Sequence, residues 1–431
     1  MSISEYSLSF NWFNIEMNNG RTSLLATFSS TLFAGMFLFM SIQGNENHSE
    51  FEFRTDWEHR VLKTDIAERI AKNQKDCTKT SMLLHPLNNY GMGSGLWNLG
   101  TAVCSSLEEK LPLHVLNDTW IWLDKDVCSK HFQVHASDKM LSSPLDCYFG
   151  KQFNQCANDV HHNSGSSKPV ADAHKHAQWI NVRCPSIVQD EGNVTAYWNL
   201  YGGFFEYLFS SLTPSVIESA KDAAYKTFNS TSSPDDMITV HIRWGDKSKE
   251  MGGLVPIHKY MSAIDELIRK HDIRGKINIL LATYDTEANQ EFRNAVKKRN
   301  FLKANQSHWN VFQYEPAAEN LLSLQELKRT SYATATAANP SLHTGIQSLI
   351  EWLLAVESKY FVLTTASNWS AVIEALRLGV LNTDCGQCTD SIDLKRNRLW
   401  IPSVRSFNRK HKIDEKYVKS QSTHLEWEPS T

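Results

Sequence analysis

The sequence between residues 236 and 380 alternates between short apolar runs and longer stretches with helical periodicity. Strands and helices that follow one another at this spacing are typical of a doubly wound parallel sheet. We therefore expect an α/β fold in this region, with its last helix ending at Gly379. The expected strands are 237–242, 277–283, 310–314 and 360–365, and the expected helices are 256–270, 286–300, 342–358 and 370–379.

The pattern before residue 236 is less regular. It predicts a helix at 97–110, a buried strand at 111–116 and a His- and Ser-rich loop at 160–176. On these grounds the chain divides into a cytosolic tail (1–21), a signal-anchor transmembrane helix (22–43), a stem (44–75), a cysteine-rich N-terminal lobe (76–235), a Rossmann-like lobe (236–385) and a C-terminal tail (386–431).

The anchor is expected because residues 24–42 contain no charged side chain. As a helix this run would rise about 28 Å, which is roughly the thickness of one hydrocarbon core. The run is longer than the apolar part of a cleaved signal peptide, and the Phe and Met residues near its end make a poor cleavage site. We expect a single-pass type II membrane protein with a lumenal body.

The cysteines and sequons agree with a lumenal body. All eight cysteines follow the apolar run, which favours disulfides in an oxidising compartment. Cys385 and Cys388 have CxxC spacing without a second such pair, so we expect a local disulfide rather than a zinc site. Asn368 lies in an expected site loop, where we expect no glycan. The Asn-X-Ser/Thr sequons are at Asn47, Asn117, Asn193, Asn229, Asn305 and Asn368.

The stem carries apolar residues at near-helical spacing, including Trp57, Ile66 and Ile70. The run is too short to identify a coiled coil. Such a helix could associate with a second copy to form a homodimer, or it could pack on the body of its own chain.

A cluster of charged residues follows the first expected strand of the regular region. His241, Arg243, Asp246 and Lys247 lie in the loop before the helix that Pro256 opens. Ligands bind at the carboxyl ends of strands in open α/β sheets, and a fixed guanidinium suits a phosphate or diphosphate. The net charge of −3 argues against a general nucleic-acid binder, so the expected anion site is local.

Further candidate residues occur at other expected strand and helix ends. Alternating glycines before a helix would let the backbone approach an anion closely and point N–H groups at it. A hydroxyl at the start of a helix could bind a phosphate or only cap the helix. These candidates are Gly91, Gly93 and Gly95 before the helix at 97–110, Asp285 after the second strand, and Ser367 and Asn368 after the fourth.

Taken together, these motifs resemble a known family. They occur in the order YGMGSGLW (90–97), VHIRWGDK (240–247) with PIHKYM (256–261), LATYD (281–285) and FVLTTAS (361–367). This set resembles the GDP-fucose-dependent fucosyltransferases, most closely the core α1,6-fucosyltransferases that modify the innermost N-acetylglucosamine of N-glycans. The resemblance covers residues 85–380 with gaps and is densest from 237 to 285.

The resemblance implies a GT-B-like body of two lobes, in which the Rossmann-like lobe binds a GDP-sugar. It also implies an inverting, metal-independent glycosyltransferase that needs no cofactor besides the donor substrate GDP-fucose. The acceptor would be an N-glycan or glycoprotein, and the enzyme would reside in the Golgi membrane.

The resemblance also implies roles for the matching residues. Arg243 would contact the β-phosphate of the nucleotide, Lys247 would neutralise the departing GDP, and Asp246 would orient Lys247. The other implied contacts are His241 with the nucleotide, Tyr260 lining the site, Asp285 as one of a carboxylate pair, Ser367 with a phosphate, Trp122 beside the nucleotide, and Glu351, after a shift of one residue, as the guanine-binding acid.

The sequence departs from the family pattern at several positions. Trp244 replaces the second arginine of the HxRR motif, and Tyr284 replaces the first member of the carboxylate pair. Met251 stands where the family has its catalytic base, so Glu250, one position earlier, is the candidate base. The family also has a C-terminal SH3 domain, which we do not expect in this sequence.

Two other functions stay open. Asp124 and Asp126 form a DxD pattern that could bind Mn²⁺ or Mg²⁺ in a metal-dependent glycosyltransferase. The departures at Trp244 and Tyr284 also fit a catalytically inactive relative that binds a glycan or a nucleotide.

Overall fold

The computed structural model describes residues 50–79, 81–87, 91–116, 120, 122, 143, 145–150, 152–153, 155–156, 166–169, 187, 194–244, 253–303, 307–315 and 344–395. These residues belong to one compact unit that begins at Glu50. The expected cytosolic tail and signal anchor lie outside them. None of the described helices combines the length and the apolar character that a membrane span requires.

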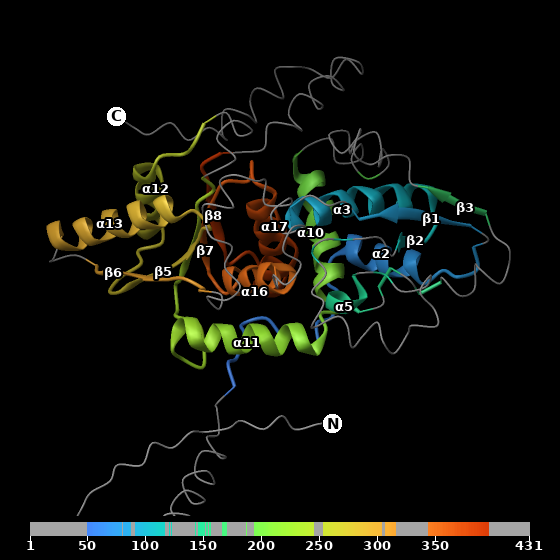
Figure 1. Cartoon of the computed structure of the whole chain (residues 1–431), viewed down its shortest axis with the longest axis horizontal. Coiled ribbons are helices and arrows are strands. Elements are labelled where there is room, and N and C mark those ends of the chain that lie inside the picture. Colours follow the sequence, from blue (N-terminus) through green and yellow to red (C-terminus); the bar gives the residue numbers. More distant parts are fainter. Residues whose placement is uncertain are drawn as a thin grey trace, which may run out of the picture. The chain divides into compact units, whose positions relative to one another are not determined.

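The larger sheet has five parallel strands: β4 (Ile238–His241), β5 (Ile277–Ala282), β6 (Trp309–Phe312), β7 (Tyr360–Leu363) and β8 (Asp390–Asp393). Their order is β6-β5-β4-β7-β8 (Figure 1). The chain moves outward from β4 through β5 and β6, and then outward on the other side through β7 and β8. The order therefore reverses between β4 and β7. The expected α/β fold with a parallel sheet is confirmed, and each of the four expected strands is present.

β8 lies in the stretch that the sequence assigned to the C-terminal tail. It pairs with β7 at the edge of the sheet, and all four of its residues are half-buried. The sheet therefore extends past residue 385. A short polar strand at a sheet edge carries no apolar run by which the sequence could reveal it.

Helices cover both faces of this sheet (Figure 1). Successive strand residues point to opposite faces, so Phe361 joins the core on one face and Val362 the core on the other. α12 and α13 cover the face on which Val362 lies, and α16 and α17 cover the face on which Phe361 lies. These helices are α12 (Ile257–Lys270), α13 (Thr286–Leu302), α16 (Thr344–Ala355) and α17 (Asn368–Leu376).

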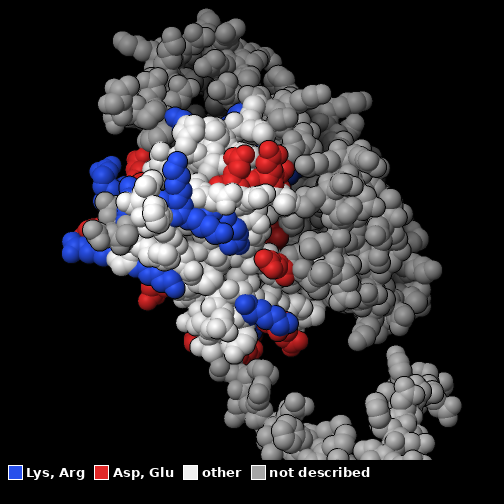
Figure 2. All heavy atoms as spheres, turned by 60° about the vertical axis from the view of Figure 1, so that its left-hand side comes forward, with Lys and Arg blue, Asp and Glu red and all other residues white. Residues whose placement is uncertain are grey.

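α12 shows why this sequence forms a surface helix. Its buried residues include Tyr260, Ile264 and Leu267, which recur every three or four positions and form one apolar stripe. Arg269 and Lys270 lie in the last turn, where cations complement the helix dipole. Figure 2 shows basic and acidic side chains interspersed on the side of the molecule to which α12 and α13 belong.

The last expected helix does not end at Gly379. After α17 the chain continues through a π-helical turn, η4 (Arg377–Leu381), and α18 (Asn382–Cys385). Gly386, with φ of 69°, ends this run in the left-handed conformation. A Cβ on Gly379 would lie 2.2 Å from the carbonyl oxygen of Gly202. Gly379 is therefore required for close helix packing rather than for a helix end.

A smaller parallel sheet contains β1 (Ser81–Pro86), β2 (Leu113–Leu116) and β3 (Ser166–Pro169), in the order β2-β1-β3. β2 confirms the strand expected at 111–116, whereas β3 lies in the stretch expected to be a loop. α3 (Met92–Glu109) connects β1 to β2 and begins five residues before the expected helix. Gly93 and Gly95 therefore lie in its first turn and not in a loop before it.

The described cysteines are all in disulfides, as the sequence predicted. Cys77 pairs with Cys156 beside the smaller sheet, and the local bond between Cys385 and Cys388 is present. The remaining described helices are α2 (Asp65–Gln74), α5 (Asp146–Phe149), α10 (Val194–Phe209) and α11 (Pro214–Phe228).

α10 lies at the centre of the structure. Every residue from Leu200 to Phe209 is buried, and a helix that is apolar all round must be surrounded by protein. Its Gly202 meets Gly379 of η4, and a Cβ on Gly203 would lie 2.5 Å from the Cβ of Ile66 on α2. The glycine pair thus lets helices from both ends of the described chain pack closely on α10.

Residues 50–64, here called the strap, are fixed to the body by two buried carboxylates. The Glu357 carboxylate, two residues after α16, accepts the backbone N–H of Arg54 at 3.1 Å. The Glu206 carboxylate, on α10, accepts the backbone N–H groups of Lys63 and Thr64 at 3.0 and 2.9 Å. It also accepts a hydrogen bond from the Arg60 guanidinium at 2.9 Å, in a pair that is almost fully buried.

The expected stem helix is therefore shorter than its apolar pattern suggested. Only 65–74 are helical, and Trp57, Ile66 and Ile70 pack in the main core of the body. Val61, in contrast, is 72% exposed. Of the two alternatives for this segment, packing on its own chain is observed, and self-association through the stem stays a prediction.

Replacing Glu206 with alanine should lower the free energy of unfolding by about 3–5 kcal/mol, because the N–H groups of Lys63 and Thr64 would lose their acceptor and the buried Arg60 guanidinium would keep only its pair with Asp384. Chemical denaturation would measure the change. Glu218, exposed on α11, provides the matched control, and Glu218→Ala should change the same quantity by no more than about 0.5 kcal/mol. Similar losses in the two variants would contradict the role of Glu206 in holding the strap.

Candidate functional site

The point where the strand order reverses holds the first group of candidate residues. His241 ends β4, is only 4% exposed, and stacks on Trp369 with ring centroids 4.4 Å apart. Its Nδ1 lies 2.5 Å from the hydroxyl of Ser370. Burial, and secondly the charge of Arg243, lower the pKa of His241 to about 3. The imidazole is therefore neutral at physiological pH, and it can donate one hydrogen bond without carrying charge.

A hydrogen-bond chain joins the ends of β4 and β7. The Thr364 hydroxyl donates to the His241 carbonyl oxygen at 3.1 Å and lies 3.3 Å from the hydroxyl of Tyr260. The Tyr260 hydroxyl also bonds to the backbone of Arg243. Tyr260 is fully buried, and burial raises its pKa to about 12. Tyr260 therefore holds the backbone of Arg243 from the side of the core, and its ring is part of that core.

Two helix N-termini meet at the same place. α17 begins after Ser367 and α3 after Gly91, and no side chain of the described residues caps either helix. The Asn368 amide donates to the Ser94 hydroxyl at 2.8 Å, and a Cβ on Gly93 would lie 3.2 Å from the Asn368 backbone. Both helices thus direct uncapped N–H groups, with the positive ends of their dipoles, toward one region.

Ser367 occupies the N-cap position without acting as a cap. Its backbone is extended, as an N-cap residue requires, but its hydroxyl makes no cap hydrogen bond. The side chain is 9% exposed. Of the two roles that the sequence left open for Ser367, capping of α17 is not observed, and contact with a phosphate stays a prediction.

β8 contributes a residue that the sequence did not predict. The Asp393 carboxylate accepts the backbone N–H of Thr365 at 3.0 Å and a short hydrogen bond from the Thr365 hydroxyl. The Lys395 carbonyl oxygen accepts the N–H of Ala366 at 2.8 Å. These bonds fix the loop that leads to Ser367. The stretch DSIDLK carries no motif, so only its place beside β7 reveals this role.

A second group of residues follows β5 and β6. Asp285 caps α13 by accepting the N–H of Ala288 at 2.9 Å, so its carboxylate already has a structural partner. Tyr284 is 38% exposed, and its hydroxyl bonds to the Glu351 carboxylate on α16. Burial raises the pKa of Glu351 to about 8, and the bond to Tyr284 only partly opposes this shift. Burial and the Glu351 charge raise the pKa of Tyr314, after β6, to about 12.

The remaining expected site residues have different positions. Trp122 is 2% exposed and packs in the main core, where its carbonyl oxygen accepts the Tyr148 hydroxyl at 2.8 Å. Its ring does not line an open site in the described structure. Asp246, Lys247 and Glu250 lie outside the described residues, as do Asp124 and Asp126 of the DxD pattern.

Trp244, the departure from the family motif, has a structural partner. Its indole N–H donates to the Val255 carbonyl oxygen at 2.8 Å, and its ring packs against the core of α12 and α13. This bond joins the residues after β4 to the residues just before α12. An arginine at this position would lose both the hydrogen bond to Val255 and this packing.

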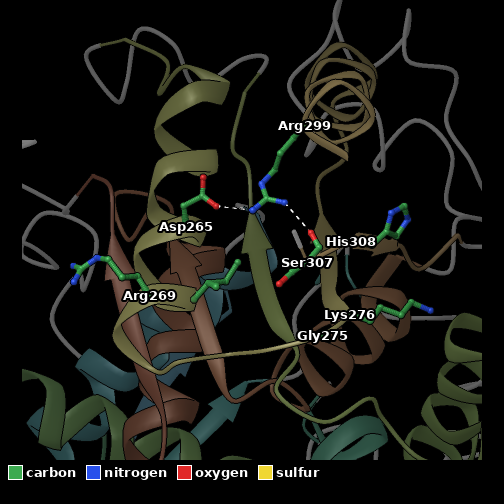
Figure 3. Close-up of a pocket in the computed structure, with 8 residues that line it drawn as sticks. Asp265, Arg269, Gly275, Lys276, Arg299, Ser307 and His308 are labelled. Carbon is green, nitrogen blue, oxygen red and sulfur yellow. Dashed lines mark hydrogen bonds and ion pairs between the residues drawn. The ribbon is translucent and has the colours of Figure 1, made fainter. Parts of the chain in front are cut away.

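A pocket of about 700 Å³ opens at the opposite edge of the sheet (Figure 3). It lies where β5 and β6 begin. Its Arg299 is fixed by Asp265 at 2.9 Å and by the Ser307 carbonyl oxygen at 3.0 Å, and it stacks on Trp309. The pocket is wide and open, and its basic residues complement the C-terminal ends of α12 and α13. Ligands of open α/β sheets bind at the carboxyl edge, so this pocket is not the candidate site.

No family model matches the sequence, and no curated protein matches it. Among solved structures, a mutant of FUT1 from Arabidopsis thaliana in complex with GDP is 12% identical, covers 72% of this chain and 71% of its own, and has a TM-score of 0.39. The fucosyltransferase NodZ from Bradyrhizobium is 13% identical over 68% of this chain and 91% of its own, with a TM-score of 0.35.

A structure of NodZ alpha-1,6-fucosyltransferase soaked with GDP-fucose is 11% identical over 69% of this chain and 93% of its own, with a TM-score of 0.36. All three TM-scores lie below 0.5, and at this level the similarity does not assign a function. Among the described residues, no group of His, Cys, Asp and Glu side chains could hold a metal ion.

The His241 imidazole should stay neutral from pH 8 to pH 5, because burial holds its pKa near 3. The Ser370 hydroxyl accepts the Thr364 N–H at 3.1 Å and can donate its own proton to Nδ1, which selects the tautomer with the proton on Nε2. Nitrogen NMR of labelled histidine would show this tautomer. Ser370→Ala should mix the tautomers, whereas a His241 that titrates near pH 6.5 in the wild-type protein would contradict the assignment.

The same shift has a consequence for stability. The folded-state pKa of His241 lies below the unfolded value, so the unfolded chain binds a proton that the folded chain does not. The buried, neutral His241 contributes fully to the stability of the fold above pH 6.5, and this contribution decreases as pH falls toward 3. Substituting His241 with asparagine should make the loss of stability over this range less steep in thermal unfolding measured at several pH values.

Proposed function

We propose that this protein is a glycosyltransferase that moves fucose from GDP-fucose to a glycan acceptor. One observation carries the proposal: two uncapped helix N-termini meet where Ser367 precedes α17 and Trp369 stacks on His241, two residues before Arg243, at the point where the strand order reverses. Backbone N–H groups and a guanidinium at such a point suit a diphosphate. Two parallel sheets, each with a helix that starts there, support a GT-B-like arrangement in which a sugar nucleotide binds between the lobes.

The reaction we propose is a single displacement with inversion. The acceptor hydroxyl attacks C1 of fucose, the bond from C1 to the β-phosphate oxygen breaks, and the electron pair leaves with GDP. Arg243 and the two helix N-termini stabilise the charge that develops on the departing diphosphate, which makes a metal ion unnecessary. The neutral His241 and the Ser367 hydroxyl donate hydrogen bonds to the nucleotide.

Three residues of this mechanism are carried over from the family resemblance alone. Lys247 would add a second cation at the leaving group, with Asp246 orienting it. Glu250 would take the proton of the acceptor hydroxyl, a step typically worth about 10²–10⁴-fold in rate. The resemblance also favours the core N-acetylglucosamine of N-glycans as acceptor, in α1,6 linkage.

For the nucleobase, we propose that Glu351 accepts hydrogen bonds from the edge of guanine. Its carboxyl group lies among Tyr284 and Tyr314, which follow β5 and β6 at the same edge of the sheet as His241. A carboxyl group kept in a largely apolar setting, with one tyrosine partner, is typical of a ligand site.

We further propose a Golgi membrane location with a lumenal body, which the uncharged run at 24–42 and the disulfides support.

Arg243→Ala should lower kcat for fucose transfer by about 10²–10³-fold, because one donor to the developing phosphate charge is lost. Released GDP would be measured with GDP-fucose and a panel of glycan acceptors, and the products would be identified by mass spectrometry. Arg269→Ala, at the opposite edge of the sheet, is the matched control and should leave kcat unchanged. Equal activity of the two variants would refute the donor site.

The same screen separates the rival functions. Binding of GDP without turnover on any acceptor would favour an inactive relative. Loss of activity with EDTA, restored by Mn²⁺ or Mg²⁺, would favour a metal-dependent glycosyltransferase and contradict the proposed mechanism.

GDP binding at pH 7 should release close to one proton. Glu351, with a pKa near 8, is mostly protonated in the free protein, but it must ionise to accept both N–H groups of guanine. Calorimetry in two buffers with different ionisation enthalpies would measure the release. Glu351→Gln should abolish it and weaken GDP binding, and a wild-type protein that binds GDP without releasing a proton would contradict the assignment of Glu351.

A further inference from the structure

Two of the sequons lie wholly within the described residues, and they occupy opposite environments. One is Asn229-Ser-Thr231, directly after α11, and the other is Asn368-Trp-Ser370, at the start of α17. A sequon alone is weak evidence, because the pattern is common by chance. Their surroundings in the folded chain distinguish them.

Asn229 is placed as an accessible glycosylation site. It ends α11 in the left-handed conformation, with φ of 49°, and is exposed together with Ser230 and Thr231. Its side-chain amide forms no hydrogen bond with the described residues. The sequon is held by its backbone, because the Thr231 carbonyl oxygen accepts the N–H of Glu52 in the strap at 2.8 Å. A sugar on the Asn229 amide would therefore extend into solvent without displacing a packed group.

Asn368 is placed so that a glycan could not be accommodated. Its amide nitrogen, the atom that would carry the sugar, donates to Ser94 at 2.8 Å. Its backbone lies within 3.2 Å of the position that a Cβ on Gly93 would take. Ser370, the third residue of its sequon, is fully buried against His241. An oligosaccharide here would force the N-termini of α3 and α17 apart.

We propose that Asn229 carries an N-linked oligosaccharide and that Asn368 carries none. In the transfer, the Asn229 amide nitrogen forms a bond to C1 of the first sugar of a lipid-diphosphate-linked oligosaccharide. The bond from that carbon to the diphosphate oxygen breaks, the lipid diphosphate leaves with the electron pair, and the amide gives up one proton. The proposal rests on the lumenal location proposed above, because this donor is used in the secretory pathway.

The test uses the full chain expressed in cells with a secretory pathway. Enzymatic release of N-glycans in ¹⁸O-water converts each glycosylated asparagine to labelled aspartate, and peptide mass mapping then reads each site in the wild-type protein. We expect label at Asn229 and none at Asn368. Asn229→Gln and Thr231→Ala should each remove one glycan in a gel-shift assay, with GDP affinity changed less than about twofold, whereas Asn368→Gln should leave the glycan count unchanged.

Protease protection in isolated microsomes separates the possible failures. If the body is protected and its Cys385–Cys388 disulfide is formed, but the Asn229 peptide carries no label, the glycosylation proposal is wrong and the location stands. Label at Asn368 in folded, GDP-binding protein would overturn the steric argument. If the protease digests the body in intact microsomes, the lumenal location fails and the glycosylation proposal fails with it.

Discussion

The packing of α10 determines where the candidate site can form. On one side, Trp97 of α3 stacks on Tyr201 of α10, with ring centroids 3.7 Å apart and planes 10° from parallel. On the other side, Gly202 meets Gly379 in backbone contact that no larger residue would permit. One helix thus fixes both α3 and the helical run that begins with α17. The N-termini of α3 and α17 can meet only because both helical segments pack closely on α10.

The site then follows from the order of the strands. The strand order reverses between β4 and β7, the point at the carboxyl edge where open α/β sheets bind ligands, and His241, Arg243 and Ser367 lie at or just after the ends of these two strands. Buried hydroxyls and a carboxylate fix these loops, through Thr364, Tyr260 and Asp393. Local positive charge at the candidate site therefore comes from Arg243 and the two helix N-termini. Such a local site is compatible with a net charge of −3 for the whole chain.

The sequence predicted the parts of this structure that have a periodic apolar pattern. The strands from β4 to β7 and their helices bury one stripe or both faces, and that burial produces the pattern. α10 has no such pattern, because it is apolar on all sides and carries two adjacent glycines that suggest a break in a helix. β8 is polar, since it needs only one neighbour at the sheet edge.

The same distinction holds for the site. His241 and Arg243 could be located because they directly follow an apolar run, and Ser367 because it precedes a helix. Tyr260 has the expected sequence position, but its depth in the core depends on how α12 packs. A glycine at position 379 is also what a helix end would require. Its role in close helix packing becomes visible only through its contact with Gly202, which is distant in the sequence.

The strap is an integral part of the body. Phe51 and Trp57 contribute to the main core of the compact unit that begins at Glu50. A protease that released the body intact would have to cut before Phe51. A fragment designed from the apolar pattern, beginning at residue 76, would lack α2 and leave the buried Glu206 and Glu357 without the N–H groups that they bind. Truncation at that point would thus expose the central helix to water.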